Sequence, residues 1–490
     1  MGADLNHAGQ GPSGGWAWSP VRRRLTSRDL LFAVSLLALA VAVLALLGVY
    51  ALVAPAVLLL IALLLRYPLE VFLAGIVTWP VLSLYLIVRL PSGLPDMRYE
   101  RLLLLGVVTS ILLARLAARR PLPRVSGPVL AVVAVQIAVY VLAILNTQPI
   151  AEPDLAVMIN SILVPFGSYW ATKALVEDPR HLRLLVVAIV GAAVLVAMSG
   201  FYERAIDAAQ SPFPVETGTA SGERFGGVPL GRAAGVFGNP AIYGAFLGVG
   251  AVGALAMRAL ASSKVARGIL SGLAVLLAYG VFVSFTRSAW LAAFGAGLAA
   301  FALIFSVRRA LWLAGSLGVA VGLLGLASFG SFSDSPILED RVLQSGNVVG
   351  RYDRALTSVS VIADRPIRGW GPGGLDVHIA ERHPAEGFDF SHNTYLTIAA
   401  DGGVLALAVF LWLTFHWLRI GFGLGRHTDV SLEGRLIAGT FVALLVAYLA
   451  SGMFLELRFF TYFVAAFWIA GAALERLTEM HPVSQVAPAA

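Results

Sequence analysis

Long apolar runs alternate with short polar connections along almost the whole chain. A transmembrane helix needs about 20 consecutive, mostly apolar residues, and this pattern predicts fourteen candidate spans. They lie at 30–48, 50–65, 69–88, 102–117, 128–145, 157–174, 184–201, 236–257, 269–286, 289–306, 310–329, 394–415, 436–455 and 459–475. The second is short and contains Pro55, so we expect about 12–14 crossings. The pattern predicts an all-α polytopic membrane protein.

Two polar connections are too long to be turns, because most connections in compact domains have about 4–6 residues. We therefore expect seven parts along the chain. They are a cytoplasmic tail (1–29), N-terminal transmembrane helices (30–201), an outer loop (202–235), central transmembrane helices (236–329), a long outer catalytic segment (330–393), C-terminal transmembrane helices (394–475) and a second cytoplasmic tail (476–490).

The basic residues predict which side of the membrane each connection faces. With the N-terminus inside, most Lys and Arg at the ends of the spans fall on the cytoplasmic side, as the positive-inside rule requires. The short loop after 128–145 carries Glu152 and Asp154 instead and is expected outside. Both termini are therefore predicted to be cytoplasmic. Both long connections fall on the outer side, where long segments translocate regardless of charge.

Composition supports this interpretation and narrows the chemistry. Hydrophobic residues make up 58% of the chain and charged residues 13%, about half the roughly 25% of a soluble domain. The chain has no cysteine, which excludes disulfides, thiolate metal sites and cysteine nucleophiles. The net charge of +7 is explained mainly by topology, so nucleic-acid binding has no support. No metal site or cofactor is expected.

Two short motifs on the predicted outer side carry an arginine beside an apolar helix. The first, 231–240, contains Arg232 and Asn239. The second contains Thr286, Arg287 and Ser288, between two apolar runs with almost no loop. Each arginine has two interpretations: a side chain that snorkels to the headgroups, or a buried anion-binding group. The hydroxyls beside Arg287 favour anion binding.

A third group of polar residues lies in the outer segment and at its exit into the membrane. It comprises Arg351, Arg354, Arg368, His392, Asn393 and Tyr395. A neutral imidazole at the position of His392 can act as a general base near pH 7, although an isolated interfacial histidine is more often structural. The three arginines either bind phosphate or glycan, or pair with Asp353 and Asp364.

Two smaller patterns have structural interpretations. Gly244 and Gly248 form a small-xxx-small pair, which is typical of close helix packing in membranes. Glu456 and Arg458, between the last two spans, are expected to form an ion pair on the outer side with a structural role.

Taken together, these motifs resemble those of the O-antigen ligase/polymerase superfamily over about residues 225–415. The resemblance rests on Arg232 with Phe237–Pro240, Thr286–Ala289, Gly350-Arg351, Asp364–Pro366, Gly369–Gly371, Ser391–Leu396 and Asp401–Gly403, in that order. The family's middle motif is commonly Ser-Arg-Gly, whereas this chain has Thr286-Arg287-Ser288. Fourteen spans also exceed the twelve usual for the ligase.

The resemblance implies a GT-C-like helical bundle in the bacterial inner membrane. It implies metal-independent transfer of a glycan from a polyprenyl-diphosphate-linked donor to a lipid or glycan acceptor on the outer face. His392 would match the catalytic histidine, and Arg232 and Arg287 the two essential arginines near the diphosphate. The proposed substrate-binding residues are Arg351, Arg354, Arg368, Asn239, Thr286, Ser288, Asn393 and Tyr395.

The motifs leave several functions open. An O-antigen ligase, which uses lipid A-core as acceptor, and a polymerase, which extends lipid-linked repeat units, share this site chemistry. A transporter or flippase of lipid-linked sugars is the alternative of another class, and an inactive scaffold is a third. A transporter is expected to carry charges near the bilayer midplane, whereas here the ionisable residues gather at one face. This distribution favours an enzyme.

Overall fold

The computed structural model describes residues 53–90, 95–145, 155–156, 158–205, 224–225, 228–229, 232–316, 319, 346–382, 391–427 and 429–481. The predicted span at 30–48, the end of that at 310–329, the N-terminal tail, most of the outer loop 202–235 and residues 482–490 of the second tail lie outside these residues. Residues 476–480, predicted to begin the second tail, continue the last helix instead. The chain divides into two compact units, Met1–Leu63 and Leu64–Ala490. All contacts described below lie within the second unit.

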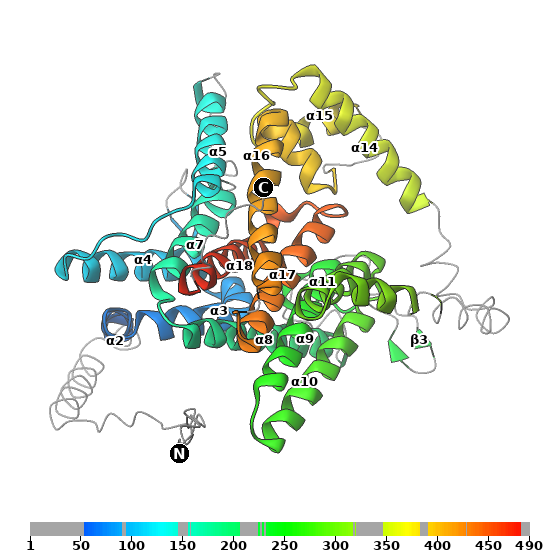
Figure 1. Cartoon of the computed structure of the whole chain (residues 1–490). Coiled ribbons are helices and arrows are strands. Elements are labelled where there is room, and N and C mark those ends of the chain that lie inside the picture. The colour runs from blue at the N-terminus through cyan, green and yellow to red at the C-terminus, as the bar shows by residue number, and fades with distance from the viewer. Residues whose placement is uncertain are drawn as a thin grey trace, which may run out of the picture. The chain divides into compact units, whose positions relative to one another are not determined.

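The described chain is almost entirely helical (Figure 1). Its long helices are α2 (Val53–Arg66), α3 (Pro68–Tyr85), α4 (Tyr99–Ala117), α5 (Gly127–Leu145), α7 (Val164–Leu175), α8 (Pro179–Ala205), α9 (Pro240–Leu260), α10 (Lys264–Val283), α11 (Arg287–Ile304), α14 (Gly346–Asp364), α15 (Gly374–Arg382), α16 (Thr394–Arg426), α17 (Leu432–Gly452) and α18 (Thr461–Met480). A π-helical turn (Ile159–Leu163) precedes α7, and 3₁₀ turns (Gly235–Phe237, Leu457–Phe459) precede α9 and α18.

Strand structure is confined to two short antiparallel hairpins in the described residues. β1 (Ile87–Val88) pairs with β2 (Met97–Arg98), and β3 (Arg224–Phe225) pairs with β4 (Val228–Pro229). Seven described helices are long and apolar enough to cross a membrane: α3, α8, α9, α10, α11, α16 and α17. The protein is thus an all-α, multi-pass membrane protein, as predicted.

Burial separates central helices from peripheral ones. The apolar stretches of α9 and α17 are 83% and 78% buried, whereas that of α10 is only 17% buried. Side chains on α10 such as Val275 therefore remain available to lipid. Small residues allow the central helices to approach closely: a Cβ on Gly248 of α9 would lie 2.4 Å from the Cβ of Ala293 on α11. A Cβ on Gly244 would lie 2.7 Å from that of Ala289, so the packing predicted for this glycine pair is confirmed.

Helix α16 is not one straight span, although a continuous run over 394–415 was predicted. Gly403 has φ 74° and ψ 175°, which interrupts the helix. The rings of Tyr395 and Phe410 lie 6.3 Å apart, whereas fifteen residues of straight helix extend about 22 Å. The first part of α16 therefore folds back at Gly403 alongside the longer second part.

The outer segment also contains structure that the hydrophobic pattern did not predict. Helices α14 and α15 form an arm that packs beside the first part of α16 (Figure 1). Val361 of α14, Leu375 and Ile379 of α15 and Ala400 of α16 make a small apolar core of their own. The amphipathic arm is held by this core as well as by the backbone contacts described below.

Candidate active site

The segment that carries Arg232 is fixed to the ends of two helices. The amide of Ala233 donates to the carbonyl of Val283 at the end of α10 (3.2 Å). The amides of Ala234 and Gly235 donate to one carboxylate oxygen of Glu203 on α8, at 2.9 and 2.6 Å. Glu203 escaped the sequence analysis, although an acid at the end of an apolar run is itself a signal.

These hydrogen bonds place the backbone of the motif 231–240 next to the end of α10, which directly precedes the motif Thr286–Ser288. Arg232 is the neighbour of Ala233, which bonds to Val283, and Arg287 follows four residues after Val283. Between them, the Thr286 hydroxyl donates to the carbonyl of Ser284 (2.8 Å) and so closes the turn. Arg287 is the first residue of α11, where the partial positive charge of the helix N-terminus adds to its own.

Asn239 and Ser288 occupy supporting positions in the same region. The side-chain oxygen of Asn239 accepts from the amides of Ala241 (2.9 Å) and Ile242 (3.3 Å), so this residue is the N-cap of α9. The Ser288 side chain is buried in the first turn of α11. The structure therefore gives Asn239 a capping role, and it places Thr286 and Ser288 around Arg287.

His392 lies in a tightly held turn directly before α16. Its backbone has φ 51°, in the left-handed region that non-glycine residues rarely adopt. On its C-terminal side, the Asn393 side chain caps α16 by accepting from the amides of Tyr395 and Leu396 (3.0 and 3.1 Å). On its N-terminal side, the buried Ser391 hydroxyl contacts that of Thr397 at 3.0 Å.

The end of α17 and its connection to α18 hold this turn by hydrogen bonds. Both the amide (3.1 Å) and the hydroxyl (2.7 Å) of Thr394 donate to the carbonyl of Leu455. The amide of Leu457 donates back to the Thr394 hydroxyl at 2.9 Å. The Tyr395 hydroxyl donates to the carbonyl of Leu449 (2.7 Å). Asn393 and Tyr395 thus hold the backbone around His392, which assigns them a positioning role in this structure.

Two glycine motifs far apart in sequence dock the arm on α16. The amides of Trp370 and Gly371 donate to the carbonyls of Ala400 (2.8 Å) and Asp401 (2.9 Å). Gly369 has φ 65°, and a Cβ there would lie 2.3 Å from the Asp401 carbonyl oxygen. A Cβ on Gly403 would lie 2.2 Å from the carbonyl oxygen of Ile367. Only glycine permits this backbone contact.

The docked arm brings two of its arginines to His392. Arg351 and Arg354 are three residues apart on α14 and therefore share a face of the helix. Burial, and then the positive charges of Arg354 and Arg351, lower the pKa of His392 from 6.5 to about 4. Partial burial, and then the positive charge of Arg287, lower the pKa of Arg351. Arg351 and Arg354 therefore lie within electrostatic reach of His392, and Arg287 lies within reach of Arg351.

This cluster has a definite chemical character. Arginine stays protonated in proteins even when its pKa is lowered, so two positive charges act on an imidazole that is neutral at pH 7, and a third, on Arg287, acts on Arg351. Like charges brought together repel, and an anion with several oxygens relieves that repulsion while accepting hydrogen bonds from the guanidinium groups. The arrangement suits a diphosphate next to a base that is ready to accept a proton.

Arg368 lies elsewhere in the arm. It occupies the exposed turn between α14 and α15, which docks on Asp401 and Gly403. In the same turn, the guanidinium carbon of Arg365 lies 3.8 Å from the centre of the Trp370 ring. Asp364, weighed as a partner for the predicted arginines, instead accepts from Arg382 at 2.8 Å.

An acidic cluster around Arg458 connects the arm, α16 and the α17–α18 connection. Arg458 forms ion pairs with Glu456, with Asp376 of α15 and with Asp401 of α16, the last at 3.3 Å. Burial raises the pKa of Glu456, whereas the charge of Arg458 opposes this shift. The predicted ion pair of Glu456 with Arg458 is confirmed. The sequence analysis did not name Asp376, and it listed Asp401 within a motif without giving it a role, although an aspartate inside an apolar span is a recognisable signal.

Within the described ranges, no group of three or more His, Asp or Glu side chains is arranged to hold a metal ion.

Comparison with known proteins gives one family match, which overlaps this cluster. Residues 272–411 match the family model described as O-Antigen ligase. The match includes Arg287, the arm with Arg351 and Arg354, His392 and the glycines of the docking contact; Arg232 and Arg458 lie outside it. No curated protein matches the chain as a relative.

Proposed function

We propose that this chain, whose residues 272–411 match the family model described as O-Antigen ligase, transfers a glycan from a polyprenyl-diphosphate-linked donor to an acceptor hydroxyl. The observation that carries the proposal is the approach of Arg351 and Arg354 to His392 and of Arg287 to Arg351. All four residues lie within the matched region. This match supports a membrane-bound glycosyl-transfer enzyme acting on lipid-linked glycans.

In the proposed reaction, the bond between the anomeric carbon and the diphosphate oxygen breaks. Negative charge then develops on the departing diphosphate, where Arg287 and Arg232 stabilise it by charge-assisted hydrogen bonds. Arg351 and Arg354 hold the diphosphate or the first sugar. No metal ion takes part in the proposal, because the guanidinium groups supply the positive charge that the leaving group requires.

His392 accepts the proton of the acceptor hydroxyl as that oxygen attacks the anomeric carbon. A general base must be deprotonated before it acts, and the lowered pKa of His392 keeps it so at neutral pH. Attack from the face opposite the diphosphate inverts the anomeric configuration. We place the reaction on the periplasmic face of the bacterial inner membrane, with both termini in the cytoplasm, because of the distribution of Lys and Arg.

The experiment that tests the proposal is glycan transfer by the purified protein from a polyprenyl-diphosphate oligosaccharide, with and without lipid A-core. We expect a shift of the lipid A-core acceptor alone, which identifies a ligase. A ladder of products without acceptor would identify a polymerase instead.

Two variants make this test specific to the site. His392→Ala and Arg287→Gln should abolish transfer, whereas His181→Ala, on α8 outside the matched region, should leave it unchanged. Wild-type transfer by His392→Ala would overturn the assignment of the base. Movement of the lipid-linked donor across proteoliposomes without transfer would favour the transporter alternative.

A further inference from the structure

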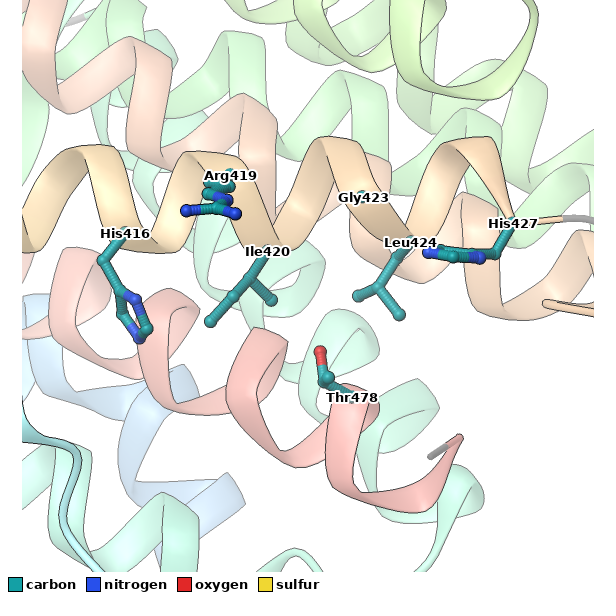
Figure 2. A pocket seen from close by; sticks show the side chains of 7 residues that line it. All are labelled: His416, Arg419, Ile420, Gly423, Leu424, His427 and Thr478. Carbon is teal, nitrogen blue, oxygen red and sulfur yellow. The ribbon is translucent and has the colours of Figure 1, made fainter. Parts of the chain in front are cut away.

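A second cationic site lies at the other end of α16 from His392. A pocket of about 320 Å³ opens between the C-terminal part of α16 and the end of α18, within the range of about 300–1,000 Å³ typical of small-molecule sites. In Figure 2, His416, Ile420 and Leu424 point from α16 towards α18, and the Thr478 hydroxyl points back at them. Arg419 and His427 also line the pocket.

The lining combines two chemical characters. Ile420 and Leu424 provide an apolar surface one helical turn apart, and Arg419, His416 and His427 provide nitrogen donors around it. Among the described residues that line the pocket, none is acidic. An occupant that fits this lining has an anionic group joined to an apolar chain.

Two acids near the pocket, Glu475 and Glu479, are already bound by other groups. The Glu475 carboxylate accepts from Tyr169 at 2.6 Å and from Trp417 at 2.9 Å, and it lies 3.3 Å from the Lys173 ammonium. The His416 Nε2 atom is farther away, 3.8 Å from Glu475. Glu479 pairs with Lys173 and with Arg476, the latter at 2.6 Å. Arg419 thus retains its charge for a ligand.

The surface around the pocket faces lipid. One turn before Arg419 on α16, Phe415 is 64% exposed, and Trp412, one turn before His416, is 51% exposed. Exposed aromatic side chains on a membrane helix lie against acyl chains or headgroups. The pocket therefore opens at the edge of the bilayer, near the end of the α16 span at Arg426.

We propose that this pocket binds one anionic membrane phospholipid, with its phosphate on Arg419 and His427, beside the Thr478 hydroxyl, and its acyl chain along Ile420 and Leu424. Basic pockets between transmembrane helices are known to take anionic lipid headgroups. The site lies outside the machinery of the transfer reaction and does not depend on the proposed function. It stabilises the packing of α16 against α18.

The test is a native mass spectrometry titration of the full-length, delipidated protein with phosphatidylglycerol, phosphatidylcholine and inorganic phosphate. We expect a phosphatidylglycerol adduct that Arg419→Gln weakens about fivefold, the effect of one basic residue near an anionic lipid surface. The matched control is Arg426→Gln on the same helix, which lies outside the lining and should bind as the wild type does. Thr478→Val is a second pocket variant and should weaken binding too, and thermal unfolding monitors whether each variant is folded.

Three results would overturn the proposal. The first is equal phosphatidylglycerol binding by the wild type and by folded Arg419→Gln and Thr478→Val. The second is equal binding of phosphatidylcholine and phosphatidylglycerol. The third is an Arg419-dependent adduct with inorganic phosphate of the same strength, which would assign the pocket to a soluble phosphate instead of a lipid.

Discussion

The protonation of His392 is the property of a single residue that most directly determines activity in the proposed reaction. Its pKa is lowered to about 4 by burial and by Arg354 and Arg351. The unfolded chain takes up this proton near 6.5 and the folded chain only near 4. Stability contributed by this residue is therefore present above pH 6.5 and is lost as the pH falls towards 4. The deprotonated base persists over the same interval.

We accordingly predict that transfer keeps its rate down to about pH 5 and loses half of it near pH 4. Arg354→Gln removes one of the charges that disfavour the imidazolium, so its half-maximal point should move up towards 6.5. The measurement is the pH dependence of the transfer rate, read from the midpoint because the variant also weakens substrate binding. Arg382→Gln, which loses only the pairs on the arm's outer face, should keep the wild-type midpoint. An unchanged midpoint in Arg354→Gln would exclude the coupling.

At the scale of elements, the docking of the α14–α15 arm depends on glycine. We predict that Gly369→Ala or Gly403→Ala detaches the arm, because both positions have positive φ and a Cβ would lie within 2.3 Å of a facing carbonyl oxygen. Transfer should fall at least about tenfold as Arg351 and Arg354 leave His392. Limited trypsin digestion after Arg368 measures detachment directly.

Gly272→Ala is the matched control for these substitutions. This glycine lies in α10, where a Cβ meets nothing within 4 Å. Alanine there should be neutral or stabilise the helix by up to about 1 kcal/mol. Digestion of Gly403→Ala at the wild-type rate would contradict the docking contact as the support of the arm.

Arg458 also holds the arm on α16, by ion pairs instead of backbone hydrogen bonds. We predict that Arg458→Gln lowers the free energy of unfolding by about 3–5 kcal/mol, because it leaves Glu456, Asp376 and Asp401 together without their cation. Without Arg458 the largest effect that opposes the raised pKa of Glu456 is lost, so the variant should regain stability as the pH falls and the carboxylates take up protons. Thermal unfolding across pH 5–8 tests both statements.

Two further variants separate charge from geometry at this cluster. Arg458→Lys should restore little, since a single ammonium cannot reproduce the planar fork that reaches three carboxylates. Arg458→Gln combined with Glu456→Gln should recover part of the loss. If Arg458→Gln unfolds at the wild-type temperature, the cluster does not hold the arm.

The sequence predicts the helices far better than the contacts between them. The apolar runs 269–286 and 289–306 correspond to Lys264–Val283 and Arg287–Ile304, because membrane thickness alone sets the length of an apolar helix. The fold-back at Gly403 was not predictable in this way. It depends on a facing carbonyl oxygen from Ile367, and hydrophobicity does not encode a partner 36 positions away.

The same difference holds at the candidate site: the sequence predicted some of its residues but not the contacts between them. The motifs indicated Arg287 and His392, since a charged or titratable group next to an apolar span requires a reason. The approach of Arg351 to Arg287 and His392, and the ion pairs of Arg458, join residues that are far apart in the sequence. The amphipathic pattern of α14 does not predict these contacts. Asn393 and Tyr395 were predicted to bind substrate. In the structure, both side chains form hydrogen bonds with backbone groups that hold the turn at His392.

At the scale of the whole molecule, the proposed reaction requires that the arm and the loop between α9 and α10 face opposite sides of the membrane. The chain has no cysteine, so a single introduced thiol can report its side without background. Ile367, 78% exposed on the arm, and Ser262, exposed between α9 and α10, are suitable positions. Neither belongs to the proposed catalytic or binding residues.

We predict that a membrane-impermeant maleimide labels Ile367→Cys in spheroplasts of intact inner membrane and labels Ser262→Cys only after permeabilisation. The reason is that Arg258, Lys264 and Arg267 flank Ser262, and basic residues in short loops remain cytoplasmic. A permeant maleimide should label both variants without permeabilisation, which controls for reactivity of the thiols. Labelling of Ser262→Cys from outside would invert the orientation, and it would place His392 on the side where a periplasmic acceptor cannot reach it.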